Sequence, residues 1–211
     1  ASTLTEEQTA VLGAILDPSV RFVHVDGGAG SGKSFVIAEA KKKLLQIHDK
    51  DKVAVMAPTG VAAQHVEGYT LAKFFGLRPN GRYSDITVRG GNLAEKVEII
   101  IIDEISMVSA ETLDICDQFC RRVKGKFFEK PFGGIKLITV GDFFQLLPVN
   151  KTEDLTRCPN VIGSRGLAFE SRVWNEILGV LAPHQIRFCS LKFSQRHAGA
   201  KFLLTALDKI R

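Results

Sequence analysis

The sequence predicts one α/β domain with a mainly parallel central sheet and helices on both faces. Short apolar runs alternate with longer segments in which apolar residues recur every three or four positions, as in strands joined by helical crossovers. The runs predicted to be buried strands are residues 22–25, 53–57, 97–102 and 135–140. The predicted helices are residues 6–16, 33–48, 60–67, 109–124, 170–181 and 198–210. No repeat or Pro/Ser-rich linker divides the 211 residues.

Length and composition narrow the class of protein. With 45% apolar and 24% charged residues, the chain has the composition of an ordinary soluble domain. It contains no apolar run near the roughly eighteen residues of a membrane span, and its first residues lack a signal-peptide layout. We therefore expect an intracellular protein, in the nucleus or mitochondrion if eukaryotic and in the cytoplasm if bacterial or viral. The net charge of +5 permits a polyanionic partner without requiring one.

The cysteines give no sign of a metal site. Cys116, Cys120, Cys158 and Cys189 form no CxxC pair and have no histidine at zinc-ligand spacing. We expect reduced and mostly buried thiols.

The first predicted helix, residues 6–16, begins with a capping box. In Thr5-Glu-Glu-Gln8 the Gln8 amide can reach back to the backbone N–H of Thr5. The local sequence favours this structural role over the alternative, in which Gln8 hydrogen-bonds the edge of an adenine ring.

A phosphate-binding loop follows the first strand. Residues 27–34, GGAGSGKS, match GxxxxGK followed by Ser or Thr, directly after a strand and directly before a helix. Glycines let the backbone turn tightly and direct N–H groups at phosphate oxygens. Lys33 would neutralise the outer phosphates and Ser34 would ligate Mg²⁺. The residues predicted to bind nucleotide here are Gly28, Ala29, Gly30, Ser31, Gly32, Lys33 and Ser34.

The third strand ends in two acids. Four consecutive isoleucines suit a strand buried on both faces, and Asp103 and Glu104 follow them. Behind a phosphate loop, Asp103 would hold Mg²⁺ through water and Glu104 would polarise the attacking water. The alternative is structural, with the acids capping the helix at Ser109 or pairing with a lysine.

The fourth strand runs into GDFFQLLP, residues 141–148, at the edge where an open α/β sheet binds ligands. Asp142 and Gln145 are therefore candidate ligand-facing residues. Two segments, 76–96 and 150–168, look irregular, and 76–96 is either a long loop or a small inserted subdomain. The basic residues of helices 33–48 and 109–124, Lys41 and Arg121 among them, are expected on solvated faces.

Several blocks together resemble the PIF (petite integration frequency) family of superfamily-one DNA helicases. The blocks are LTEEQ, GGAGSGKS, APTGVAA, GYTLAKFFG, IIDEISMV, PFGGIKLITVGDFFQLLPV, AFESRVW and FSQRHAGAKFLLTALDKIR. The resemblance runs from about residue 3 to 211 and implies the N-terminal RecA-like P-loop ATPase lobe of a helicase that moves five-prime to three-prime. It implies ATP and Mg²⁺ as cofactors, single-stranded DNA and single-to-double-strand junctions as partners, and work in DNA repair and recombination.

The resemblance also implies roles for single residues. Lys33, Asp103, Glu104, Gln145 and Arg196 would be catalytic, with Gln145 sensing the γ-phosphate and Arg196 acting as an arginine finger. A surface arginine near a helix start is the alternative for Arg196. Under the resemblance Gln8 becomes the adenine-reading glutamine, which reverses the local preference.

On the DNA side, the resemblance implies that Pro58, Thr59 and Gly60 meet one phosphate and Thr70 the next. Without the resemblance, Thr59 is nearly as well explained as a helix cap. Phe74 could stack on a base, although either it or Phe75 is expected in the core.

The sequence departs from the family pattern at Leu147, Ser31 and His197. No second RecA-like lobe follows Arg211, so we expect a monomeric lobe that binds nucleotide but hydrolyses it weakly. Two alternatives are a nucleotide-binding interaction module without turnover and a P-loop kinase of a small molecule. The lack of an evident lid and the presence of GDFFQLLP argue against the kinase.

Overall fold

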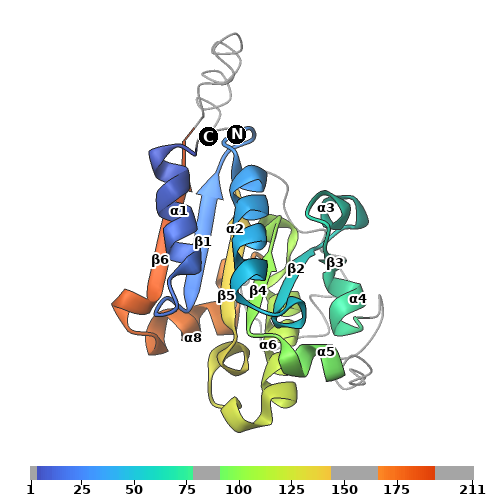
Figure 1. Cartoon of the computed structure of the whole chain (residues 1–211). Coiled ribbons are helices and arrows are strands. Elements are labelled where there is room, and N and C mark those ends of the chain that lie inside the picture. Colours follow the sequence, from blue (N-terminus) through green and yellow to red (C-terminus); the bar gives the residue numbers. More distant parts are fainter. Residues whose placement is uncertain (1–3, 78–90, 144–165, 193–211) are drawn as a thin grey trace.

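The computed structural model describes residues 4–77, 91–143 and 166–192, and within them a six-stranded sheet forms the centre of the molecule (Figure 1). Its strands are β1 (Phe22–Gly27), β2 (Val53–Ala57), β3 (Tyr69–Thr70), β4 (Ile99–Ile102), β5 (Lys136–Gly141) and β6 (Ile186–Leu191). They lie in the order β3-β2-β4-β5-β1-β6, and every pairing is parallel. The predicted α/β class and parallel sheet are confirmed.

Helices cover both faces of this sheet. They are α1 (Glu6–Leu16), α2 (Lys33–Ile47), α3 (Gly60–His65), α4 (Leu71–Phe75), α5 (Gly91–Lys96), α6 (Ala110–Lys124) and α8 (Arg172–Val180). Successive strand residues point to opposite faces. Ile99 and Ile101 of β4 therefore join the core beneath α1 and α2, whereas Ile100 and Ile102 join the core of α6 and α8. Both cores need apolar residues from one strand, which explains the run of four isoleucines.

The sequence prediction missed two strands and two α-helices. β6 has a mixed pattern in which Arg187 and Ser190 interrupt the apolar residues, and most of its residues stay partly exposed because it is an edge strand. β3 has only two residues, and α4 follows it directly. Within the segment 76–96, predicted to be irregular, α5 covers Gly91–Lys96. The predicted helix 198–210 lies outside the described residues.

A buried ionic network anchors α6. Oδ2 of Asp117 accepts a hydrogen bond from Nε of Arg121 at 2.8 Å, and Oδ1 accepts one from the backbone N–H of Phe132 at 2.6 Å. Arg121 also donates to Oε2 of Glu176 on α8 at 2.7 Å. The expected solvated position of Arg121 is therefore wrong, because its guanidinium joins α6 to α8 through Glu176 and also donates to the carbonyl oxygen of Phe128 at 3.2 Å.

The described cysteines match the expectation of unpaired thiols. Cys116 and Cys120 are buried on α6 and Cys189 is half-buried. Burial raises the pKa of the Cys116 and Cys120 thiols above their usual value, so both stay protonated. Cys158 lies outside the described residues. No helix in the described part of the chain is long and apolar enough to cross a membrane.

Candidate nucleotide and DNA site

Strand order brings three predicted motifs to one edge of the sheet. β5 lies between β1 and β4, with Gly141 opposite Asp26 and Thr139 opposite Ile102. Because all strands are parallel, their carboxyl ends share the edge toward which β1 points in Figure 1. The end of β5, where GDFFQLLP begins, therefore separates the phosphate loop from Asp103. This placement accounts for polar residues at that strand end.

The phosphate loop packs directly against Gln8. Gly32 adopts a left-handed backbone conformation with φ of 90°. A Cβ at this position would lie 2.5 Å from Nε2 of Gln8, so no larger residue fits without displacing that amide. The positive φ favours glycine at this position, and the absence of a Cβ leaves room for the amide of Gln8.

Gln8 has two sets of neighbours. Its Oε1 accepts a hydrogen bond from the backbone N–H of Thr5 at 3.0 Å, and Oγ1 of Thr5 accepts one from the Gln8 N–H at 3.2 Å. The predicted capping box is therefore confirmed. The Nε2 end of the same side chain lies against the loop at Gly32. Capping fixes the carboxamide beside the nucleotide loop, so the structural role does not exclude a binding role.

Lys33 folds back over the loop. Its Nζ donates to the carbonyl oxygens of Gly27 and Gly28, the latter at 3.0 Å. The buried Oγ of Ser31 has no hydrogen-bond partner among the described residues. A phosphate group in the loop would give both side chains oxygen partners. The loop therefore has the donors that a nucleotide phosphate needs.

Asp103 is buried at the end of β4. Its carboxylate accepts a hydrogen bond from the backbone N–H of Glu104 at 2.9 Å. Burial raises the pKa of Asp103, and that hydrogen bond and the charges of Lys33 and His65 oppose the rise. The positive charge of Lys33, in the phosphate loop, therefore favours the charged form of Asp103. A cation beside Asp103 would stabilise its charged form.

Glu104 adopts a backbone conformation that is unusual for its residue type, with φ of 53° and ψ of 44°. Such a left-handed residue costs about 1–3 kcal/mol and occurs often at functional sites. The structural alternatives for the two acids are not supported, because Oγ of Ser109 caps α6 itself. Among the described residues, neither Asp103 nor Glu104 forms an ion pair.

The donors at this edge suit Mg²⁺ rather than a metal held by the protein alone. The described residues contain no group of three or more His, Cys, Asp or Glu that could hold a metal. Mg²⁺ keeps several waters and takes phosphate oxygens, so one or two oxygen ligands from the protein are enough. Ser34, exposed at the start of α2, and Asp103 provide a hydroxyl and a carboxylate.

An aromatic stack supports the end of β5. Phe143 stacks on the ring of His24, with ring centres 5.4 Å apart and an interplanar angle of 26°. Nδ1 of His24 hydrogen-bonds Oγ1 of Thr139 at 2.9 Å, and Trp174 meets the imidazole edge-on. No local sequence signal predicted this stack, because its members come from three separate elements. Gln145, Arg196 and the departures at Leu147 and His197 lie outside the described residues.

His24 gives a prediction for acid stability. Burial lowers the pKa of His24 from 6.5 to about 4. Between pH 6.5 and pH 4, His24 is therefore protonated in the unfolded chain but mostly neutral in the folded chain. The free energy of unfolding should fall by up to about 3 kcal/mol as the pH drops from 6.5 to 4. In urea unfolding across this range, His24→Phe should flatten the decline and His184→Phe, at an exposed site, should not. An equal decline in both variants would contradict the prediction.

The predicted DNA-facing threonines both cap helices. Oγ1 of Thr59 accepts from the N–H of Ala62 at 3.2 Å, and Oγ1 of Thr70 accepts from the N–H of Lys73 at 3.1 Å. Each hydroxyl keeps its own proton for donation to another acceptor. Pro58 and Gly60 flank Thr59 at the start of α3. Capping therefore holds these hydroxyls in place without using their donor capacity.

Phe74 requires a correction. Its side chain is 8% exposed and packs in the core with Phe75, which it meets edge-on at 4.9 Å. The ring is therefore not presented as a stacking face for a base, because α4 turns both phenylalanines inward.

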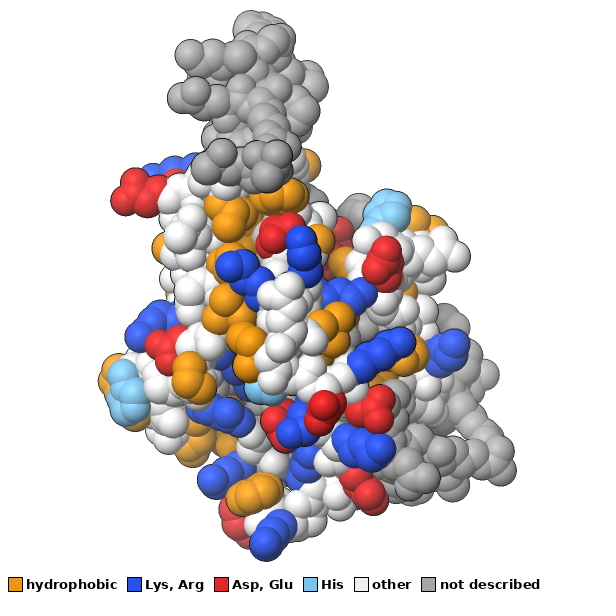
Figure 2. All heavy atoms as spheres, viewed as in Figure 1, with side chains coloured by type: hydrophobic (Ala, Val, Ile, Leu, Met, Phe, Trp, Pro, Cys, Tyr) orange, Lys and Arg blue, Asp and Glu red, His pale blue; other side chains and the backbone are white. Residues whose placement is uncertain are grey.

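The visible surface carries no large basic patch. Figure 2 shows Lys and Arg side chains interspersed with Asp and Glu on the face that includes α2. The positive net charge therefore does not identify this face as a binding surface for a polyanion.

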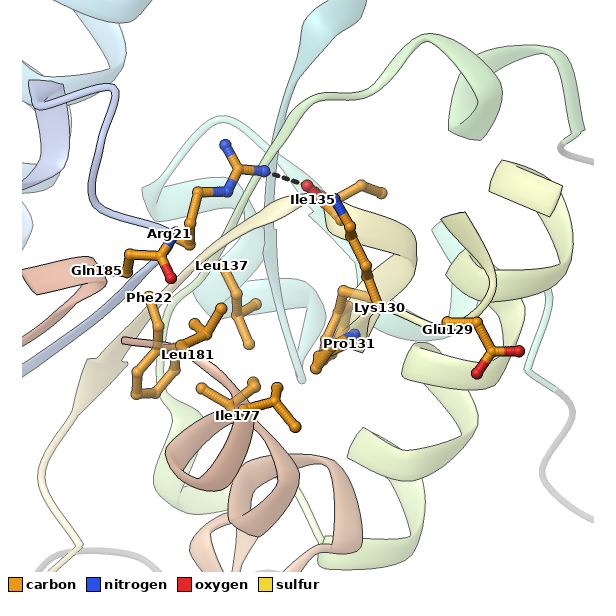
Figure 3. Close-up of a pocket in the computed structure, with 13 residues that line it drawn as sticks. Arg21, Phe22, Glu129, Lys130, Pro131, Ile135, Leu137, Ile177, Leu181 and Gln185 are labelled. Atoms are coloured by element: carbon orange, nitrogen blue, oxygen red, sulfur yellow. Dashed lines mark hydrogen bonds between the residues drawn. The ribbon is translucent and has the colours of Figure 1, made fainter. Parts of the chain in front are cut away.

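A cavity of about 450 Å³ lies at the opposite edge of the sheet, where β1 and β5 begin (Figure 3). Its apolar walls include Phe22, Pro131, Ile135, Leu137, Ile177 and Leu181. Arg21 on its rim donates to the carbonyl oxygen of Gly134, and the Glu129 carboxylate points away from the cavity. The phosphate loop follows the far end of β1. This cavity is therefore separate from the nucleotide site.

Comparisons with known proteins agree with this geometry. The family model described as PIF1-like helicase matches residues 3–202. The ATP-dependent DNA helicase RRM3 of Saccharomyces cerevisiae is 34% identical over 182 residues, which cover 83% of this chain and 24% of that protein. The crystal structure of Pif1 helicase from Candida albicans superposes with a TM-score of 0.79 at 31% identity, covering 99% of this chain and 44% of that one.

A further solved relative contains ligands. Pif1 helicase from Bacteroides, in complex with ADP-AlF3 and single-stranded DNA, has a TM-score of 0.73 at 30% identity. The match covers 91% of this chain and 42% of that chain. The chain thus spans about a quarter of its yeast relative and less than half of the solved proteins.

Proposed function

The chain belongs to the PIF1-like helicase family, and from this membership we propose that it is the nucleotide-binding motor lobe of an ATP-dependent DNA helicase. The observation that carries the proposal is the meeting of the phosphate loop, the end of β5 and the Asp103–Glu104 pair at one sheet edge. These are the groups that phosphoryl transfer to water requires: a phosphate cradle, a metal ligand and a carboxylate that directs water.

Each residue then has a part in ATP hydrolysis. Lys33 exchanges its bonds to Gly27 and Gly28 for phosphate oxygens, and Gln8 reads the adenine edge from its place beside the loop. Ser34 and Asp103 hold Mg²⁺, which neutralises the phosphates when bound. Glu104 orients the attacking water. In the proposal Gln145 and Arg196 report on the γ-phosphate, as the family resemblance implies.

DNA lies across the start of α3 and the start of α4. Thr59 and Thr70 donate their hydroxyl protons to successive phosphates of a single strand, and the backbone N–H of Gly60 adds to the first contact. A lobe of this kind binds single strands and junctions, and moves five-prime to three-prime once a second lobe closes over ATP. In this proposal the lobe is monomeric and works inside the cell in DNA repair and recombination.

The test of this function is steady-state ATP turnover with Mg²⁺, with and without a single-stranded oligonucleotide. We expect slow turnover that rises when DNA is added. Nucleotide binding with no response to DNA would instead favour an interaction module. Transfer of labelled phosphate to an acceptor other than water would favour a small-molecule kinase.

Lys33→Met supplies the binding prediction. The methionine side chain is unbranched and only one heavy atom shorter, but it loses two or more charge-assisted hydrogen bonds to phosphate, each worth roughly 1.5–3 kcal/mol. Mg·ATP affinity measured by calorimetry should fall at least about 100-fold, the value for two bonds at the low end of that range. Lys42→Met, at an exposed position of the same helix, should bind as the unaltered chain does. Unchanged affinity in Lys33→Met would contradict the assignment of the loop.

A further inference from the structure

Lys41 connects the nucleotide helix to a distant turn. It lies on α2, about 12 Å along the helix axis from Lys33. Its Nζ donates to the carbonyl oxygens of Val66 and Glu67, both at 3.0 Å, and lies 3.4 Å from Oε2 of Glu67. The expected solvated position of Lys41 is wrong, since its side chain is only 22% exposed. This side chain thus joins α2 to residues 66–68.

The turn at residues 66–68 is tightly held on its other side. Glu67 has a left-handed conformation with φ of 49°, and the N–H of Gly68 donates to the carbonyl oxygen of Ala63 at 2.8 Å. Gly68 approaches β2 so closely that a Cβ there would lie 2.2 Å from the carbonyl oxygen of Val55. Lys41 therefore contacts a segment that packs closely against strand β2.

The same turn separates the two DNA-facing threonines. It ends α3, which Thr59 caps, and leads directly into β3, whose last residue Thr70 caps α4. β3 pairs with the end of β2, so that Thr70 lies opposite Ala57. The turn is therefore linked to Thr59 through α3 and to Thr70 through β3.

We infer that Lys41 is a positioning residue that couples the nucleotide state of the phosphate loop to the grip on DNA. α2 begins at Lys33, so a nucleotide that shifts the start of this helix shifts Lys41 with it. Three polar contacts of Lys41 carry that shift to the turn at residues 66–68, between Thr59 and Thr70. Helix α2, Lys41 and this turn thus form a continuous physical path between the phosphate loop and the proposed DNA contacts. The inference rests on the proposed DNA contacts of Thr59 and Thr70.

The test compares the affinity for DNA in different nucleotide states. Fluorescence anisotropy of a labelled oligothymidylate is measured with no nucleotide, with Mg·ADP and with a Mg-bound non-hydrolysable ATP analogue. In the unaltered chain we expect the affinities to differ by roughly 5-fold or more, the low end of typical allosteric coupling. In Lys41→Met the ratio of DNA affinities between nucleotide states should approach one, while nucleotide affinity measured without DNA stays within about 2-fold.

Matched variants separate coupling from simple support of the fold. Lys42→Met, exposed on the same helix, should keep the full ratio, and Lys41→Arg should restore most of it because a cationic donor remains. Lys41→Gln, with a shorter and uncharged donor, should reduce the ratio in part and serves if Lys41→Met does not fold.

Three results would overturn the inference. The first is a folded Lys41→Met or Lys41→Gln variant in which the ratio of DNA affinities between nucleotide states is unchanged. This holds even if DNA affinity falls equally in every nucleotide state, because an equal fall indicates that Lys41 only supports the fold. The second is an unaltered chain that binds DNA with the same affinity in every nucleotide state. The third is an unaltered chain that binds no DNA, which would overturn the proposed function as well.

Discussion

Replacing Glu104 with glutamine should lower DNA-stimulated ATP turnover by about 10²–10⁴-fold, the usual contribution of a positioned general base. The amide keeps the size of the side chain and one accepting oxygen, but it cannot take a proton from water. Because Asp103, Lys33 and the phosphate loop are untouched, Mg·ATP affinity should remain within about 2-fold. Glu104 has a left-handed backbone directly after β4, and its backbone N–H donates to the Asp103 carboxylate at 2.9 Å.

The control for this experiment is Glu129→Gln. Glu129 is an exposed acid on the rim of the cavity at the opposite edge of the sheet, so its replacement should leave turnover unchanged. Turnover is measured by phosphate release and binding by calorimetry on the same preparations. A Glu104→Gln variant with full turnover would exclude Glu104 as the residue that activates water.

Replacing Asp117 with alanine should cost about 3–5 kcal/mol of unfolding free energy, which is typical when one partner of a buried ion pair is removed. The change leaves the backbone N–H of Phe132 without its acceptor and removes one carboxylate from the buried Arg121. Glu176 still pairs with Arg121, so the loss should lie toward the lower end of this range. The measurement is equilibrium unfolding in urea.

An exposed acid of the same type provides the control. Asp51 pairs with Lys96 at 3.2 Å, with more than half of each side chain exposed. Asp51→Ala should therefore change stability by no more than about 1 kcal/mol. Equal losses of unfolding free energy in Asp117→Ala and Asp51→Ala would show that burial of the Asp117 network does not add to stability.

Much of the fold followed from local patterns. The run of four isoleucines predicted β4 because a strand between two helical layers needs apolar residues on both sides. Helix 6–16 was predicted with its observed bounds because Thr5 and Gln8 satisfy the first backbone N–H groups locally. β6 was missed because an edge strand has fewer buried positions, so its sequence lacks a clear apolar run.

The sequence indicated the residue types of the candidate site but not how they pack. The phosphate loop and the Asp103–Glu104 pair were recognised because their residue types and their neighbouring strand and helix are contiguous in sequence. Phe74 was placed wrongly because the turn of α4 directs both adjacent phenylalanines into the core. Lys41 and Arg121 were placed wrongly because their partners are distant in sequence or on other elements.

The sequence by itself determined the α/β class, the phosphate-loop motif and the types of side chain that we propose bind ATP and Mg²⁺. These properties depend on contiguous residues and on helix and strand periodicity. Only the tertiary structure decided that β5 lies between the phosphate loop and Asp103, that Gln8 abuts Gly32, and that Lys41 holds the turn before Thr70. Strand order and long-range hydrogen bonds depend on how whole elements pack, and no local stretch of sequence specifies its distant partner.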